Sequence, residues 1–268
     1  MKRILWGFLG VWLLIGTGSA VTVEISVELE HLTWIEAEKA LANYEVALIA
    51  LGARSKEHGP HLQLNNDFLM AEYLKDRVAD QVPVAVLPTL QYGCYPAFLE
   101  YPGSVSLRAE TFRDMIVDIA RSMSGYGIKK LYVLNTGVST LRPLRQAREG
   151  LASQGIELRF LNILETDEGL PEGLLEQEGG THADEGETSM MLYIAPQTVD
   201  MSKAVKDYDP RPDRPGLSRD IRGRGSYSPT GIWGDPTLAT REKGRIIVEH
   251  TIAEIIKQVK ELIALGLE

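Results

Sequence analysis

The stretch EVALIALG, residues 45–52, contains six apolar residues in a row between a glutamate and a glycine. An apolar run of this length is typical of a strand that is buried on both faces of a parallel sheet. Upstream, Thr33 and Glu36 have the spacing of a capping box, which predicts a helix over 33–44. A helix followed by a fully buried strand indicates a sheet that is covered by helices.

Amphipathic and apolar segments alternate along most of the chain that follows. The pattern predicts strands over 82–87, 129–135 and 156–163 and helices over 68–79, 110–124, 141–154, 187–195 and 238–265. Asn66 or Asp67 is expected to cap the helix that begins near residue 68. Because strands that alternate with helices form right-handed βαβ units, the sequence predicts an α/β fold with a mostly parallel sheet covered on both faces.

Composition and charge bound the size of the fold and the class of partner. The 268 residues are 44% hydrophobic and 24% charged, which suffices for one sizeable domain with a buried core. The formal net charge of −9 argues against nucleic acid or an anionic membrane as partner, since no basic stripe is available to neutralise phosphates. A small-molecule substrate is the expected partner. Cys94 is the only cysteine, so no internal disulfide can form.

The N-terminal segment MKRILWGFLGVWLLIGTGSA, residues 1–20, has the features of a secretory signal peptide. Two basic residues precede an apolar segment, and Gly18 and Ala20 stand where a signal peptidase requires small side chains. We expect cleavage after Ala20, a single α/β domain over 21–268, and an exported protein that is periplasmic or secreted and free of the membrane. An uncleaved anchor is the alternative. N-terminal sequencing of protein from the native host that begins at Met1 would contradict the prediction of cleavage.

The segment SKEHGPHLQLNND, residues 55–67, follows the 45–52 strand and holds Glu57, His58, His61 and Asp67. Imidazole and carboxylate groups are ligands of zinc and manganese, and a metal with an open coordination position activates water. The alternative is a polar turn with surface histidines and with Asp67 as a plain helix cap. Ligand sites of parallel sheets lie at the C-terminal ends of the strands, where this segment falls.

A second polar cluster, GGTHADEGETS at 179–189, places His182 beside three carboxylates just before a predicted helix. Three of the five histidines in the chain lie in these two clusters. This concentration favours a site over two unrelated turns.

Several short segments together resemble the creatininase (creatinine amidohydrolase) family. They occur in the family's order and are EHGPHL at 57–62, ND at 66–67, LQYG at 90–93, YPGS at 101–104, HADEGETS at 182–189 and REKG at 241–244. The resemblance implies a three-layer α/β/α sandwich, assembly as a homo-oligomer that is usually a hexamer, and a two-metal site that directs hydroxide onto an amide. It also implies that His58 and Asp67 are metal ligands, His182 a catalytic or substrate-binding histidine, and Glu187 a site carboxylate.

Two departures from the family pattern concern the metal ligands. Lys56 stands where the family has a ligating Glu, although a bulge would let Glu57 serve in its place. The segment NTGVST at 135–140 has neither the His nor the Glu that the family usually supplies there. A complete two-metal site therefore does not follow from the sequence.

The leading hypothesis is an exported, metal-dependent amidohydrolase that hydrolyses the C–N bond of a small cyclic or linear amide. In it, one or two divalent ions, zinc or manganese, are held by Glu57, His58 and Asp67, and His182 and Glu187 act in catalysis. The second hypothesis is a metal-poor homologue that binds a small ligand without hydrolysis, and the third is a structural oligomer with a vestigial pocket. The retained acids near His182 favour the first, and the lost ligands near residue 137 favour the second.

Overall fold

A computed structural model describes residues 26–166, 169–209 and 216–266 of the chain. Its main sheet has five strands in the order β1-β3-β2-β4-β5, and all neighbouring strands are parallel. The strands are β1 (Val27–Glu28), β2 (Val46–Leu51), β3 (Ala85–Leu90), β4 (Lys130–Asn135) and β5 (Glu157–Phe160). Every residue of the central strand β2 is buried, as its unbroken apolar run predicts. The expected signal peptide lies outside the described residues.

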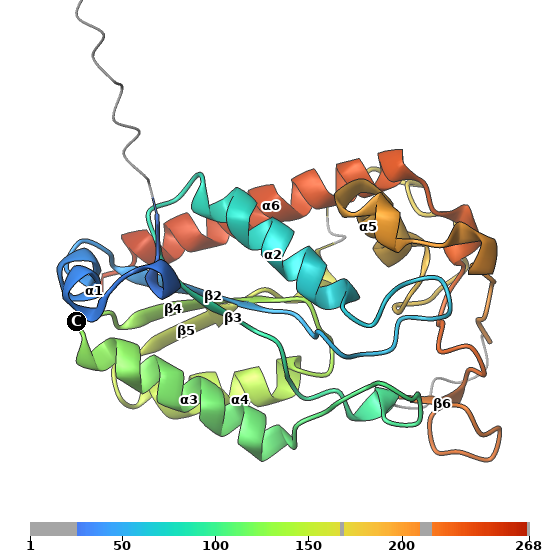
Figure 1. Ribbon diagram of the computed structural model, residues 1–268, viewed down its shortest axis with the longest axis horizontal. Helices are drawn as coiled ribbons and strands as arrows, with labels where there is room; N and C mark the ends of the chain where they lie inside the picture. The colour runs from blue at the N-terminus through green and yellow to red at the C-terminus, as the bar shows by residue number, and fades with distance from the viewer. Residues whose placement is uncertain (1–25, 167–168, 210–215, 267–268) are drawn as a thin grey trace, which may run out of the picture.

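Helices cover both faces of the sheet and form a three-layer α/β/α sandwich (Figure 1). One face is covered by α2 (Asn66–Ala79), α5 (Glu185–Ile194) and α6 (Arg241–Ala264), and the other by α3 (Ala109–Gly125) and α4 (Leu141–Ala152). Each face has its own apolar core: Leu48, Leu74 and Ile255 belong to the first, and Ile49, Phe112 and Leu144 to the second. The predicted fold class is confirmed.

The short helix α1 (Trp34–Leu41) begins with the predicted capping box. The Thr33 hydroxyl accepts from the backbone N–H of Glu36, and the Glu36 carboxylate accepts from the backbone N–H of Thr33 at 2.8 Å. Strand β3 begins three residues later than predicted and contains Pro88. Pro88 has no N–H to donate, and the ladder with β2 shifts register between Ile49 and Leu51, opposite this proline.

The predicted cap of α2 is wrong. The helix begins at Asn66, its N-cap is Asn65, and no side chain makes a capping hydrogen bond. The Asp67 carboxylate instead turns toward the loop that follows β2, where two cationic side chains lie against it. Asp67 therefore does not cap α2, and its carboxylate is free to take part in the site.

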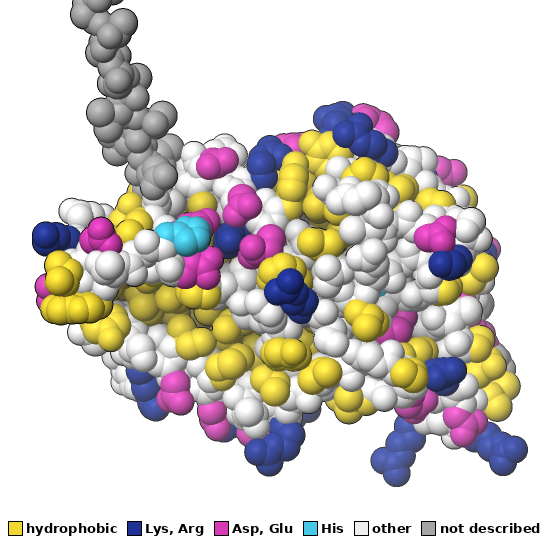
Figure 2. All heavy atoms as spheres, viewed as in Figure 1, with side chains coloured by type: hydrophobic (Ala, Val, Ile, Leu, Met, Phe, Trp, Pro, Cys, Tyr) yellow, Lys and Arg dark blue, Asp and Glu magenta, His cyan; other side chains and the backbone are white. Residues whose placement is uncertain are grey.

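The long connections at the C-terminal edge of the sheet contain a small two-stranded element, β6 (Leu217–Ser218) with β7 (Ser226–Tyr227), which was not predicted. Acidic and basic side chains are scattered over the face of the molecule in Figure 2, and hydrophobic side chains gather in a band below the middle of this view. Among the described residues, no helix is both long enough and apolar enough to cross a membrane.

Candidate active site

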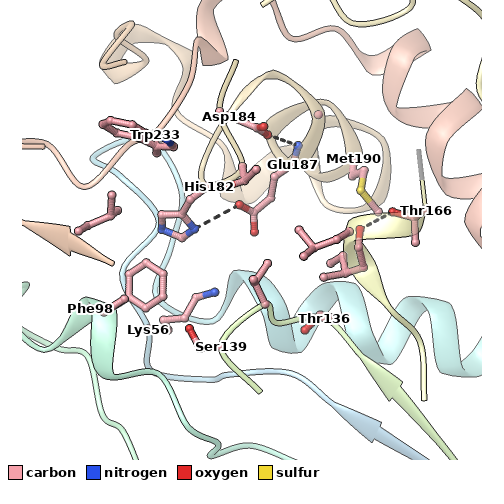
Figure 3. A pocket seen from close by; sticks show the side chains of 18 of the residues that line it. Lys56, Phe98, Thr136, Ser139, Thr166, His182, Asp184, Glu187, Met190 and Trp233 are labelled. Carbon is pink, nitrogen blue, oxygen red and sulfur yellow. Dashed lines mark hydrogen bonds and ion pairs between the residues drawn. The ribbon is translucent and has the colours of Figure 1, made fainter. Parts of the chain in front are cut away.

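A pocket of about 450 Å³ lies where the loops after β2, β3 and β4 meet the start of α5. Its wall combines aromatic and ionisable side chains, among them Phe98, Trp233, Lys56, His182 and Glu187. Figure 3 shows the last three side chains turned toward the middle of the pocket from separate segments of the chain. A concave, partly apolar pocket with a few convergent polar groups is the usual form of a small-molecule site.

Lys56, which lines this pocket, forms a buried ion pair with Asp67 behind the pocket wall. The Lys56 Nζ lies 2.7 Å from Asp67 Oδ2, and the two side chains are 5% and 0% exposed. Burial alone would raise the pKa of the Asp67 carboxyl, but the charges of Lys56 and His58 outweigh it and the pKa is lowered. Asp67 is therefore a carboxylate held between two cations.

His58 is fixed at both ring nitrogens. Its Nδ1 lies 2.9 Å from the carbonyl oxygen of Lys56, and its Nε2 lies 2.7 Å from Asp67 Oδ1. Both partners can only accept, so both ring nitrogens carry protons in this arrangement. Burial would lower the pKa of His58, yet the Asp67 carboxylate, supported by Glu187, raises it to about 9.

Glu187 lies in the first turn of α5 and is positioned by backbone geometry. Asp184 caps the helix by accepting from the Glu187 N–H at 2.9 Å. Ala183 has left-handed backbone, with φ 48°, and donates its N–H to Glu187 Oε2 at 2.7 Å. Burial favours the neutral acid, but His58 and His182 hold the pKa of Glu187 well below its usual value. The group is a carboxylate aimed into the pocket.

His182 lies opposite Glu187 and is held by Glu57. The Nε2 of His182 lies 3.0 Å from the Glu57 carbonyl oxygen and 3.2 Å from its carboxylate, and Nδ1 lies 3.7 Å from Glu187 Oε2. The Glu57 carboxylate also accepts from the backbone N–H of Gly59. Because Nε2 is directed at Glu57, the Nδ1 of His182 is the atom that faces the pocket.

Three of these side chains are arranged as metal ligands. One ligand atom each from His58, His182 and Glu187 lies within 4.8 Å of the others. The nearest pair, His58 Nε2 and Glu187 Oε1, is 3.3 Å apart. Donors at about 2.0–2.2 Å from a tetrahedral zinc ion are roughly 3.3–3.6 Å from one another, so the spacing of this trio suits a zinc ion once the Nε2 proton of His58 is lost.

The structure groups the residues that the sequence identified in a different way from the one expected. It brings His58 into contact with Asp67 and places His182 and Glu187 near the same imidazole. Glu57 does not join the trio and acts on His182 instead. The metal and catalytic assignments of these residues remain predictions.

His61, the second histidine of the first cluster, does not line the pocket. Its Nε2 lies 2.8 Å from the Thr188 hydroxyl. Burial lowers the pKa of His61 to about 4, so this histidine is neutral at neutral pH. His61 packs between the loop and α5 as a structural residue.

The loop after β4 contributes only uncharged side chains to the pocket, among them Thr136 and Ser139. A Cβ atom added at Gly137 would lie 3.2 Å from both the Tyr95 ring and the Thr140 hydroxyl. The buried Tyr95 ring therefore occupies space that a larger side chain at residue 137 would need. This loop offers neither an imidazole nor a carboxylate to an ion.

Sequence reasoning missed the aromatic walls of the pocket. Phe98 lies in the loop after β3, with its ring centroid 4.5 Å from that of His182, and Trp233 pairs with His182 through the backbone. Phe98 ends a three-residue 3-10 helix and Trp233 lies in a loop, so neither segment is long enough for a periodic pattern to show where its side chain points. An aromatic residue between two glycines, as in GIWG at 231–234, is the one available signal.

The chain has relatives of known activity over most of its length. A family model described as creatinine amidohydrolase matches residues 30–259. Creatinine amidohydrolase of Pseudomonas putida is 28% identical over 261 residues, which cover 88% of this chain and 97% of that protein. The mycofactocin precursor peptide peptidase of Mycobacterium ulcerans is 28% identical over 223 residues, which cover 79% and 83% of the two chains.

Solved structures show the same relationship. A structure described as "Creatininase Mn" matches with a TM-score of 0.71 at 26% identity, and the match covers 90% of this chain and 100% of that one. A creatininase variant described as Zn-Zn type also matches with a TM-score of 0.71 at 26% identity, over 90% and 99% of the two chains. The family model spans nearly all of the domain. This chain belongs to the creatininase (creatinine amidohydrolase) family.

Proposed function

We propose that this protein hydrolyses the C–N bond of a small cyclic or linear amide, with one zinc or manganese ion held by His58, His182 and Glu187. The observation that carries the proposal is the convergence of these two imidazoles and one carboxylate within the pocket. The names of the relatives, an amidohydrolase and a peptidase, support a reaction at an amide. Export and assembly as a homo-oligomer belong to the same proposal.

A bound zinc or manganese ion would supply Lewis acidity at the amide carbonyl and would lower the pKa of water. Neighbouring groups of the chain orient the three side chains that would bind the ion. The Lys56 carbonyl holds His58 Nδ1, so Nε2 lies toward Asp67 Oδ1 and Glu187 Oε1 and would have to leave Asp67 to bind an ion. Glu57 holds the Nε2 of His182, which leaves Nδ1 on the side of Glu187. The Ala183 N–H fixes Glu187. Hydrolysis adds one water across the C–N bond: a linear amide gives a carboxylic acid and an amine, and a cyclic amide gives one molecule that carries both groups.

The apolar part of the wall shapes the substrate space. Phe98 and Trp233 line one side of the pocket, and Met190 and Leu164 lie among the residues of the wall. Such walls exclude water and strengthen electrostatic interactions with a bound substrate. The pocket volume of about 450 Å³ suits a small molecule or the end of a peptide.

A second candidate function is the binding of a small ligand without hydrolysis. It is favoured by the charge balance of the cluster, since the cations Lys56 and His58 already neutralise the carboxylates Asp67 and Glu187 without any metal. In that case the pocket would take a polar small molecule between Lys56 and His182.

Hydrolysis assays on metal-stripped and metal-loaded protein separate the two candidates. We expect protein loaded with zinc or manganese to hydrolyse at least one class in a panel of cyclic amides, N-formyl compounds and short peptides. Stripping with a chelator should reduce the rate at least about 100-fold, because the ion carries the main electrostatic stabilisation. His182→Ala should behave like the stripped protein, and His61→Gln is the matched control. Loaded protein that binds panel members yet hydrolyses none would favour the second candidate.

A further inference from the structure

We propose that the Lys56 ammonium is a built-in cation that takes the place of a second metal ion, so that the site accepts at most one divalent ion. The inference deepens the proposed function and rests on it for the single ion at His58, His182 and Glu187. One solved relative is described as Zn-Zn type, and we compare its two zinc ions with the single ion proposed for this chain. The contacts, burial and charges around Lys56 carry the argument.

The surroundings of Lys56 are those of a bound cation rather than of a surface lysine. Its Nζ lies 2.7 Å from Asp67 Oδ2, in an ion pair whose partners are almost completely buried. The Nζ also lies 4.8 Å from the Phe98 ring centroid and 5.5 Å from that of Tyr95. Aromatic faces stabilise a desolvated ammonium at these distances. One carboxylate and two rings therefore hold the charge at the pocket wall.

The side of the pocket that faces Lys56 lacks the groups that a second ion would need. The loop after β4 presents Thr136 and Ser139, and Gly137 is packed against the Tyr95 ring. With His58 and Glu187 committed to the ion at the trio, a second divalent ion beside Asp67 would have one carboxylate, hydroxyl groups and an ammonium 2.7 Å from that carboxylate. Zinc sites have three or four nitrogen, sulfur or carboxylate ligands from the protein. Repulsion by the ammonium adds to this deficit.

The charges in the cluster agree with one ion at most. Asp67 lies between Lys56 and His58: the His58 Nε2 hydrogen-bonds to Oδ1, and the Lys56 ammonium lies 2.7 Å from Oδ2 as an ion pair without hydrogen-bond geometry. A divalent ion at the trio would displace the Nε2 proton of His58, since a metal-bound imidazole is neutral. Lys56 would then remain as the partner of Asp67. The pair persists whether or not the ion is bound.

The test is a double-mutant cycle on Lys56 and Asp67, followed by thermal unfolding in metal-free buffer. Lys56→Gln leaves the Asp67 carboxylate buried with a weaker set of partners and should lower Tm by about 10 °C. Adding Asp67→Asn should recover most of this loss, because a neutral pair replaces the ion pair and an asparagine keeps an oxygen for His58. The recovery is a readout that a simple loss of packing would not produce.

Lys130→Gln is the matched control for Lys56→Gln. Lys130 is also buried and makes a 2.7 Å ion pair, but its partner Glu45 is 66% exposed. Water can solvate that carboxylate after the substitution, so Tm should fall by no more than about 4 °C. An equal fall in Lys56→Gln and Lys130→Gln, or the absence of recovery in the double variant, would overturn the role of Lys56.

Metal content supplies the second measurement and does not depend on the folding of a variant. Wild-type protein equilibrated with excess zinc or manganese and then dialysed should carry one ion per chain by plasma emission. Two ions per chain would overturn the inference and leave the proposed function intact. No bound ion together with a positive cycle would remove the metal-dependent function while supporting Lys56 as the cation of the site.

Discussion

Replacing Glu187 with glutamine is expected to weaken zinc or manganese binding at least about 100-fold. The carboxylate is the single negative ligand of the trio, and its two oxygens lie 3.3 Å from His58 Nε2 and 3.7 Å from His182 Nδ1. The amide keeps the size of the side chain but loses the charge, so the two imidazoles would face an ion without compensation. Isothermal titration of stripped protein with zinc measures the change directly.

The control for this substitution is Glu176→Gln. Glu176 is 61% exposed and belongs to an ion pair with Lys243 outside the pocket wall, so its neutralisation should leave zinc affinity unchanged. Circular dichroism would verify that both variants keep the wild-type fold. Equal zinc affinity in wild-type protein and Glu187→Gln would mean that the trio is not the metal site.

Gly244→Ala is expected to destabilise the protein by about 3 kcal/mol. Gly244 lies in the first turn of α6, and a Cβ atom there would approach the backbone carbonyl oxygen of Ser189 in α5 to 1.8 Å. Backbone cannot move aside as a flexible side chain does, so the two helices must separate. Because Glu187 lies two residues before Ser189, the shift should also disturb the site. Urea denaturation measures the loss of stability.

Gly150→Ala is the matched control. Gly150 is an exposed helix residue of α4, and nothing lies within 4 Å of a Cβ atom added there. This substitution should stabilise the protein by about 0.5–1 kcal/mol, because alanine has the higher helix propensity. A loss of similar size in both variants would show that the close contact of α5 and α6 does not explain the requirement for glycine at 244.

The architecture could be predicted because its signals are local. The apolar run of β2 is buried on both faces, and the amphipathic pattern of α3 places Phe112 and Ile116 in the core. Strand β1 was not predicted, because two residues carry no periodicity and their pairing with β3 is a tertiary feature. The start of β3 was misplaced because Val82 and Val84 are buried in the core without belonging to the strand.

The site could be predicted as a set of residue types but not as a geometry. The two clusters identified His58, Asp67, His182 and Glu187, and the structure brings all four together. The sequence left open whether Glu57 or Lys56 faces the site. That choice depends on the backbone path of the loop after β2. The Lys56 N–H donates to the Leu64 carbonyl, and the Ser55 carbonyl accepts from the Val105 N–H. The second of these bonds joins residues far apart in the chain, so local sequence patterns could not predict it.

The most direct test of the central claim is a crystal structure of the protein grown with zinc and measured at the zinc absorption edge. One anomalous peak per chain is expected, bound by His58 Nε2, His182 Nδ1 and Glu187 at about 2.0–2.2 Å, with the Lys56 ammonium still on Asp67. A chain without a peak at this trio, or with a second ion in the place of the Lys56 ammonium, would contradict the account.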